Sequence, residues 1–338
     1  MAVGVVQVGF AEMVAGVASL FGFVPSRSVI AVCVAGDGSL ICSVRWDLPE
    51  RDEISALVDS AAMVASQARG AGATAAIVIG VDAESAPGES TDAVVMVADT
   101  LSRSGVSAWE VAQRCGDRWR GDVAGLWQVL PPVPAGLGGD RAVLPSREAV
   151  VAQVGPAPDP DLVGVGAAVR AAAPEAAGWS WPNQVAALAA VLTGPGLPDP
   201  VTMAAAAAAV TDLGRRDAVL GWLVPSSGLD DIIDPDAAAV CRERLAVPWL
   251  PGPPGREDAL RAVAVAAAFP DDAPGCVGPL LIAGWLAWAT GDGVLAGAAW
   301  ERVQRVAPGH RLSGLLLKAL ERGLRPGERL TGPDGRGG

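Results

Sequence analysis

Residues Thr74-Ala75-Ala76-Ile77-Val78-Ile79-Gly80-Val81 form an uninterrupted, mostly apolar run that decides the fold of the N-terminal half. A strand that is covered by helices on both faces has a continuous apolar sequence, whereas a half-exposed strand alternates apolar and polar residues. Apolar residues at helical spacing occur before this run, from Ile54 to Ala68, and after it, from Asp92 to Arg103. We therefore predict a central strand of a sheet that is packed between helices.

A β-hairpin is predicted before this strand. Residues 29–35 and 40–46 are rich in β-forming side chains, and the intervening residues 36–39, Gly-Asp-Gly-Ser, supply glycines that tolerate the positive φ of a tight turn. Residues 47–50, Asp-Leu-Pro-Glu, match the start of a helix with Asp47 as the capping residue.

Further strands are predicted after the second helix. Residues 106–112 repeat the strand-helix-strand unit, and shorter strands are expected at 118–120 and 126–130. The expected N-terminal domain, residues 1–130, is a mixed-sheet, three-layer α/β sandwich.

Beyond residue 130 the pattern changes from mixed to helical. Residues 131–145 are rich in Pro and Gly and are predicted to form a linker, followed by a helical domain over 146–325 and a flexible tail over 326–338. Helices are expected at 146–154, 161–173, 182–192, 202–223, 235–245, 256–268 and in further segments after Cys276. The expected fold class of the whole chain is α/β plus all-α.

Residues 277–310 resemble a single tetratricopeptide repeat, a helical hairpin of about 34 residues. The small residues of that repeat match Gly284 and Ala296, its turn matches Gly291-Asp292, and its large apolar and closing positions match Trp300 and Pro308. A solenoid needs several copies. Two interpretations remain open: the hairpin docks on the helical domain, or it forms part of a peptide-binding groove.

Composition argues against several classes of partner. The net charge of −12 and the pI near 4.6 would repel a phosphate backbone, so nucleic acid is not an expected partner. The longest apolar run, Cys276 to Ala289, is shorter than the roughly 20 residues of a membrane-spanning helix. Glu12 interrupts the apolar opening where a signal peptide would be continuous. We expect a cytoplasmic protein that has no membrane partner.

The cysteine and histidine pattern does not suggest a metal site. The single histidine, His310, is distant in sequence from all five cysteines, which have no Cys-x-x-Cys spacing. Asp230, Asp231, Asp234 and Asp236 lack the spacing of a calcium-binding loop. We expect no metal and no cofactor. If the hairpin forms, Cys33 and Cys42 lie opposite each other, either as two buried thiols or as a reversible disulfide.

Candidate ligand-binding residues follow or flank the predicted strands. Ligands of open α/β sheets bind beyond the carboxyl ends of strands, which points to Asp82 and Glu84, although a solvated loop is the simpler interpretation. Arg27 and Arg45 are candidates for holding a carboxylate or phosphate, and structural pairing of Arg27 with Asp47 explains its position equally well.

Three arginines near the end of the predicted sheet form a second candidate group. Arg114, Arg118 and Arg120 alternate around a short turn and would hold one anionic group if their side chains converge. A solvated strand edge is the alternative interpretation.

Several blocks together resemble an actinobacterial family called domain of unknown function 4192. They are Leu20–Ile30, Val44–Pro49, Ser146–Ala152, Arg216-Asp217, Ala287–Gly293, Pro308 and Leu312. The resemblance extends over nearly the whole chain and implies no established activity. Many members of the family have a tryptophan pair followed by a cysteine-rich stretch, whereas here Arg118-Trp119-Arg120-Gly121 continues to Trp127 with only Cys115 nearby.

Two functions from different classes are consistent with the sequence. No recognisable catalytic motif is present, which favours a noncatalytic binding or scaffolding protein that forms homo-oligomers through Trp285, Trp288 and Trp300. The alternative is an enzyme or sensor for a small polar ligand at the carboxyl edge of the sheet, where Arg27, Arg45, Asp82 and Glu84 are the candidate residues.

Overall fold

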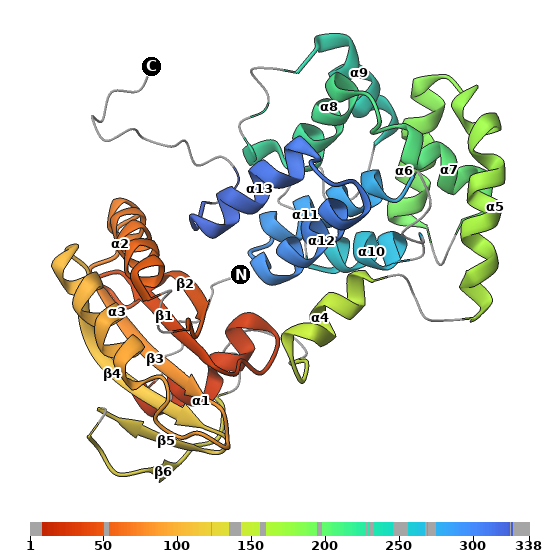
Figure 1. Ribbon diagram of the computed structural model, residues 1–338. Coiled ribbons are helices and arrows are strands. Elements are labelled where there is room, and N and C mark those ends of the chain that lie inside the picture. Colours follow the sequence, from red (N-terminus) through yellow and green to blue (C-terminus); the bar gives the residue numbers. More distant parts are fainter. Residues whose placement is uncertain are drawn as a thin grey trace. The chain divides into compact units, whose positions relative to one another are not determined.

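The chain forms two compact units, Met1–Ala149 and Val150–Gly338, in the computed structural model (Figure 1). The structure describes residues 9–50, 54–122, 124–134, 143–155, 160–194, 198–227, 229, 233–245, 256–267, 269, 275–324 and 326. The division falls inside helix α4 (Arg147–Val154). Most of the predicted tail, 326–338, lies outside the described residues.

The N-terminal unit is built on a mixed sheet. Its described strands are β1 (Ser28–Val34), β2 (Leu40–Asp47), β3 (Ala75–Asp82), β4 (Ser107–Cys115), β5 (Arg118–Gly121) and β6 (Gln128–Val129). Their order is β2-β1-β3-β4-β5-β6; β3 and β4 pair in parallel, and the other neighbouring strands pair antiparallel. The predicted hairpin and the central position of β3 are both confirmed.

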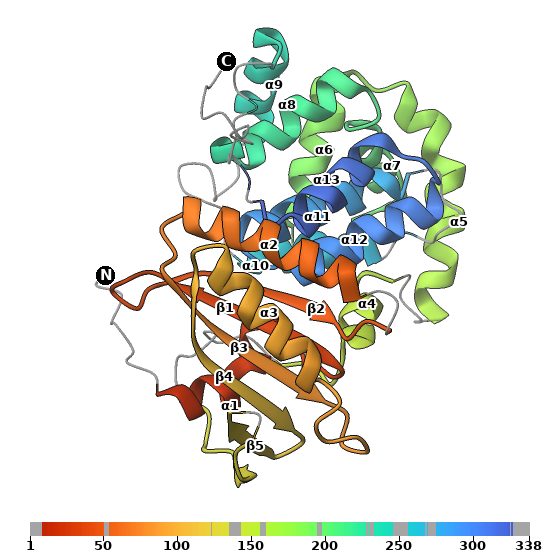
Figure 2. The same cartoon turned by 60° about the vertical axis from the view of Figure 1, so that its left-hand side comes forward.

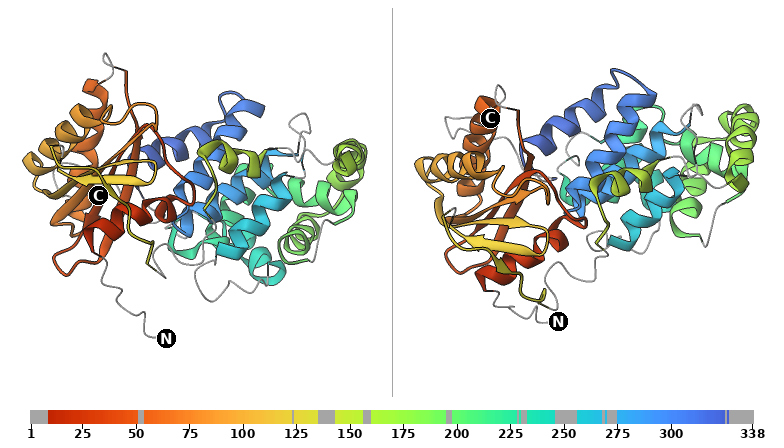
Figure 3. Two further views of the ribbon diagram at one scale, coloured as in Figure 1. Left: turned by 90° about the horizontal axis from the view of Figure 1, so that it is seen from below. Right: turned by 60° about the horizontal axis from the view of Figure 1, so that its bottom comes forward.

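Helices cover both faces of this sheet. Helices α2 (Ile54–Gly70) and α3 (Thr91–Arg103) lie on one face, and α1 (Phe10–Phe21) lies on the other, against β4 and β5 (Figures 2 and 3). Side chains alternate between the two faces along each strand. The core below α2 and α3 therefore receives Val29 and Val78, while Ile79 points toward the other face. This is the expected three-layer arrangement.

Residues 47–50 do not begin a helix as the sequence predicted. Asp47 is instead the last residue of β2, where it pairs with Ser28 of β1, and its carboxylate forms an ion pair with Arg45. Residues 48–50 are irregular, and α2 begins at Ile54 in the part of the chain that the structure describes. Continuation of the β-ladder to Asp47 overrides the local capping signal.

The C-terminal unit is helical throughout its described residues. Its elements are α5 (Pro160–Ala177), α6 (Trp181–Thr193), α7 (Pro200–Ala208), α8 (Leu213–Leu223), the short 3₁₀ helix η1 (Pro225–Ser227), α9 (Pro235–Arg244), α10 (Arg256–Ala267), α11 (Val277–Ala289), α12 (Gly293–Val306) and α13 (Arg311–Glu321). The single helix predicted over 202–223 is two helices. Asp212 causes the break, because its side chain accepts the backbone N–H of Arg215 and thereby caps α8.

Helices α11 and α12 form the predicted hairpin over 277–310. Gly291 takes the left-handed conformation, with φ of 81°, and the side chain of Asp292 caps α12 by accepting the N–H of Leu295 at 3.1 Å. Trp300 of α12 packs so closely over Gly284 that a Cβ atom at Gly284 would lie 2.3 Å from the indole Nε1. The resemblance of this hairpin to a tetratricopeptide repeat remains a prediction.

Tryptophans that the sequence offered as an interaction surface belong to the core. Trp285, Trp288 and Trp300 are all buried, and their rings stack edge to face in sequence, with centroids 5.5 and 5.7 Å apart. The indole N–H groups of Trp285 and Trp288 donate to backbone carbonyl oxygens within the unit. Helical spacing places these residues on a common face but does not reveal that neighbouring helices cover it. We therefore assign them to packing.

A buried arginine connects three helices of the C-terminal unit. Arg302 of α12 is fully buried, and its guanidinium donates hydrogen bonds to the carbonyl oxygens of Val154, Ala266 and Phe269. Val154 ends α4 and Ala266 lies in the last turn of α10. A cation at these positions satisfies carbonyl groups that have no partner inside their own helices and complements the negative ends of the helix dipoles.

Two sequence features of the C-terminal unit have local structural roles. His310 caps α13 through its Nδ1 atom, which accepts the N–H of Ser313 at 3.3 Å. Asp234 caps α9, whereas Asp230 and Asp231 lie outside the described residues. Among the residues that the structure describes, no helix combines the length and apolar character needed to cross a bilayer.

Candidate functional site

A cleft of about 410 Å³ lies at the carboxyl edge of the sheet, where the parallel strands β3 and β4 both end. The loop after β3 and the turn between β4 and β5 form its walls. Its lining residues are Glu84, Pro87, Cys115, Gly116, Asp117, Arg118 and Trp127. This is the edge at which open α/β sheets bind ligands, and the volume lies within the range of small-molecule pockets, about 300–1,000 Å³. Glu84 is therefore placed where we expected a ligand-binding residue.

Asp82 does not face the cleft as a free acid. Its carboxylate is buried and accepts the backbone N–H groups of Gly88 at 2.5 Å and Ser90 at 2.9 Å. The loop from β3 to α3 thus folds around this carboxylate. We correct the role of Asp82 from ligand candidate to a residue that shapes the wall of the cleft.

Replacing Asp82 with alanine is expected to destabilise the N-terminal unit by about 2 kcal/mol, because the buried N–H of Ser90 and the partly buried N–H of Gly88 would lose their charged acceptor. Glu84→Ala is the matched control: this carboxylate lies two residues away, is exposed, and should alter stability by less than about 0.5 kcal/mol. Denaturant unfolding followed by hydrogen exchange of peptides from each unit measures the difference. Equal effects of the two substitutions would refute the structural role.

Polar side chains connect this loop to the aromatic wall of the cleft. The buried amide of Gln113 donates to Thr91 Oγ1 at 2.9 Å and to Ser90 Oγ at 3.2 Å, and its oxygen accepts from Arg120 Nε at 2.7 Å. The Arg120 guanidinium lies 4.9 Å from the centroid of the Trp127 ring. These contacts fix the Arg120 guanidinium on the Trp127 ring.

Negative charge predominates around Cys115. Its pKa is raised, first because the thiol is removed from water and then because of the carboxylates of Asp82, Glu84 and Glu89, while Arg118 acts in the opposite direction. The Cys115 thiol donates to the carbonyl oxygen of Ala83 at 3.4 Å. A thiol with a raised pKa is a poor nucleophile near neutral pH. The arrangement is suited to attracting a positively charged group.

The two predicted arginine candidates are bound elsewhere. Arg27 Nε lies 3.3 Å from Glu89 Oε2, and the side chain of Arg27 is 56% exposed, so this surface ion pair contributes little to stability. Arg45 lies on β2, three strands away from β4 in the sheet order. Its Nε donates to Ser28 Oγ at 2.9 Å. Neither residue lines the cleft.

The arginine cluster of the sequence does not converge on one anion. Arg114 donates to the carbonyl oxygens of Val14 and Ala15 in α1, whereas Arg120 is held by Gln113 on the face that carries α3. Only Arg118 lines the cleft. Alternation along the strands places Arg114 on the face opposite Arg118 and Arg120, and the hydrogen bonds to Gln113 hold Arg120 away from the cleft.

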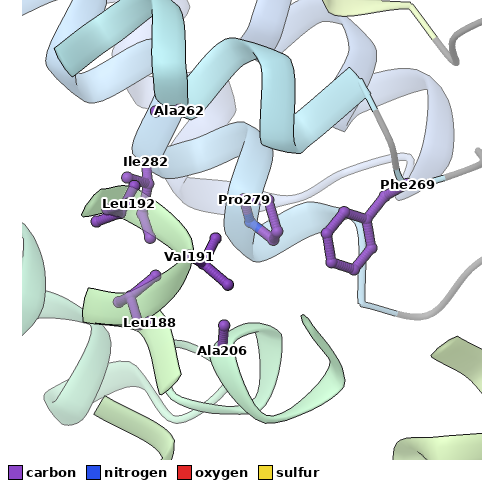
Figure 4. A pocket seen from close by; sticks show the side chains of 8 residues that line it. All are labelled: Leu188, Val191, Leu192, Ala206, Ala262, Phe269, Pro279 and Ile282. Carbon is purple, nitrogen blue, oxygen red and sulfur yellow. The ribbon is translucent and has the colours of Figure 1, made fainter. Parts of the chain in front are cut away.

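Two hollows in the C-terminal unit are weaker candidates. Figure 4 shows one of them, an apolar space of about 10 Å³ among Leu188, Val191, Leu192, Ala206, Ala262, Phe269, Pro279 and Ile282. It is too small and too apolar to hold more than a single water molecule. The second is an open groove of about 610 Å³ beside Trp179 and Asn183, lined mainly by small side chains and by no charged one.

Over the described ranges, no three His, Cys, Asp or Glu side chains are grouped so that they would hold a metal ion.

Sequence reasoning missed Gln113 and Trp127, and it assigned Arg120 to an anion-binding group instead of to its contact with the Trp127 ring. Gln113, Arg120 and Trp127 meet because β4, β5 and the segment before β6 are neighbours in the sheet, and the pairing Gln113↔Arg120 depends on the strand register. The only signal available was the turn between two short strands, Cys115 to Arg118, which places polar residues next to Glu84.

Comparison with known proteins identifies a family for the chain. A family model described as "Domain of unknown function (DUF4192)" matches residues 11–327. Neither a curated protein nor a solved structure matches significantly.

Proposed function

We propose that this chain, which belongs to the DUF4192 family, is a binding protein whose N-terminal unit holds a small, positively charged ligand at the carboxyl edge of its sheet. The observation that supports the proposal is the cleft of about 410 Å³, which is lined by two exposed carboxylates, Glu84 and Asp117, and by Trp127. Of the two functions considered from the sequence, the geometry thus favours the ligand-binding alternative.

The chemistry of the lining residues indicates the charge of the ligand. Glu84 and Asp117 would accept hydrogen bonds from an ammonium or guanidinium group, and an indole ring attracts a cation placed over its face. Arg118 at the same cleft would accept a carboxylate, so an amino acid or another zwitterion fits as well as a simple amine.

Binding explains this cleft better than catalysis does. The Cys115 thiol is the nucleophile nearest to the cleft, and the raised pKa keeps it protonated near neutral pH. The Asp82 carboxylate accepts two backbone N–H groups and is therefore not free to act as a base.

Ligand binding is tested first by native mass spectrometry of the protein purified gently from its own host, which reports a retained small molecule and the subunit count together. Titration calorimetry then uses a panel of amino acids, primary amines and quaternary ammonium compounds. We expect at least one cationic probe to bind, and Glu84→Gln with Asp117→Asn to weaken it by about tenfold or more, because each charged hydrogen bond contributes about 1.5–3 kcal/mol.

Glu110→Gln is the matched control for that titration, since Glu110 is an exposed carboxylate on β4 that does not line the cleft. The Glu110→Gln variant should bind the probe with the same affinity as the unmodified chain. Failure of every cationic probe to bind, or equal losses in the control and in the cleft variant, would reject the proposal.

Self-association remains a second candidate function, and exposed apolar side chains support it. Leu126, Val129 and Trp109 are 85%, 73% and 69% exposed, and β6 is an edge strand within the described sheet. We propose a second copy of the chain as the partner, because an edge strand can pair with its own equivalent about a two-fold axis.

The subunit count from the same native mass spectrum tests self-association. Self-association through the β6 edge would be supported by an oligomer that Leu126→Asp converts to a monomer and that Leu213→Asp, at an exposed residue of α8, leaves intact. A monomer in the unmodified chain would reject it.

A further inference from the structure

Cys33 and Cys42 face each other directly across the β1–β2 hairpin. They are register partners in an antiparallel pair, and both belong to the side of the sheet that packs below α2 and α3. The two side chains lie close enough for Cys42 to raise the pKa of the Cys33 thiol. Antiparallel partners have Cα atoms about 4.5–5.5 Å apart, and disulfides span about 4.4–6.8 Å. The backbone is therefore already placed for a bond between the two sulfur atoms.

Access differs between the two residues. Cys33 is fully buried, whereas Cys42 is partly exposed on β2, an edge strand of the described sheet. The pairing register shifts immediately after this pair, between Cys33 and Val34, where the strand partners change to Val34 and Leu40. Such an irregularity gives the strand ends room to adjust locally.

We propose that Cys33 and Cys42 are a redox-active dithiol that forms a reversible cross-strand disulfide, with Cys42 as the attacking thiol and a small soluble disulfide as the oxidant. The β1–β2 hairpin does not line the cleft, so this disulfide would form whether or not the cleft holds a ligand.

The surroundings of Cys33 support Cys42 as the attacking thiol. Hydrogen bonding to Cys42, burial and the charge of Cys42 all raise the pKa of Cys33. Cys33 is therefore a poor first nucleophile. Cys42 is the partly exposed member of the pair, so it is the residue that an external disulfide can reach.

Thiol–disulfide exchange with glutathione disulfide would form the bond in two steps. The Cys42 thiolate attacks one sulfur of glutathione disulfide, forms a mixed disulfide and releases one glutathione thiolate. Cys33 then gives up its proton and attacks the Cys42 sulfur, the bond to glutathione breaks, and a second glutathione thiolate leaves. The protein dithiol loses two electrons and two protons, and glutathione disulfide gains them as two glutathione molecules.

The test uses the full chain with Cys115→Ser, which removes the other partly exposed thiol and leaves four of the five cysteines. The folded protein is equilibrated with glutathione disulfide, quenched in acid, unfolded and alkylated, and its mass is measured. We expect two of the four alkylation sites to be lost, a mass lower by two hydrogen atoms before alkylation, and full recovery with dithiothreitol.

Cys42→Ser in the same background is the matched variant and should retain all of its thiols, since Cys33 is buried. Peptide mapping should place the bond between residues 33 and 42. Four free thiols after equilibration, a stable glutathione adduct on Cys42 that does not close, or a disulfide that persists in Cys42→Ser would each overturn the proposal.

Discussion

Replacing Arg302 with methionine is expected to destabilise the C-terminal unit by about 3–5 kcal/mol, the largest effect that we anticipate for a single substitution. Methionine has a similar length and removes the cost of burying a charge, but its side chain has no N–H group to donate a hydrogen bond. The carbonyl oxygens of Val154 and Phe269 would lose this donor, and that of Ala266 would keep only the backbone N–H of Phe269. Because each buried oxygen that is left without a donor costs about 1–3 kcal/mol, the loss exceeds the gain.

Arg305→Met provides the comparison within the same helix. Arg305 is exposed one turn of α12 away, so its replacement should change the free energy of unfolding by less than about 0.5 kcal/mol. Denaturant unfolding of the full chain, combined with hydrogen exchange of α4, α10 and α12, measures both variants. An Arg302→Met chain as stable as Arg305→Met would show that the buried guanidinium does not hold these helix ends together.

Gly284→Ala is expected to cost about 2–3 kcal/mol, although alanine normally stabilises a helix relative to glycine by about 1 kcal/mol. The new methyl group would lie 2.3 Å from Trp300 Nε1 and 2.7 Å from two further indole atoms. Trp300 is fully buried, and α11 and α12 would have to separate to admit the methyl group. The same closeness accounts for the buried indole N–H, which has no hydrogen-bond partner among the described residues.

Gly164→Ala is the control for this substitution. Gly164 is an exposed residue of α5 with open space where a Cβ atom would be added, so alanine should stabilise the chain by about 0.5–1 kcal/mol. Combining Gly284→Ala with Trp300→Phe should recover part of the loss, because the smaller ring removes the clashing atoms. Thermal and denaturant unfolding would refute the clash if both alanine variants were stabilised.

The sequence predicted elements whose signals are local. The apolar run at 74–81 identified the central strand β3, and the glycines at 36–39 identified the hairpin, because burial on both faces and a tight turn each impose a characteristic composition. The helix boundaries that we predicted from capping signals were less accurate. The break before Leu213 depends on Asp212, which we had placed inside a continuous helix.

For the candidate site, the sequence predicted only its location at the carboxyl edge of the sheet. Glu84 was found because it follows a central strand, but Asp82 was misassigned because its acceptor role depends on how residues 83–90 fold back. The contacts of Gln113 with Arg120, and of Arg120 with Trp127, arise from strand pairing, which a single sequence does not specify. Burial of Trp288 and Trp300 likewise depends on neighbouring helices.

The contact between Arg302 and Val154 also bears on the order in which the chain folds during synthesis. The two residues are 148 positions apart in the sequence. The Val154 carbonyl group at the end of α4 therefore lacks this donor until most of the C-terminal unit has been translated. The last described strand of the N-terminal sheet ends at Val129. We therefore expect the N-terminal unit to fold while the ribosome is still translating the C-terminal unit, and ribosome-bound chains that stop before residue 302 to leave the second unit open to proteases.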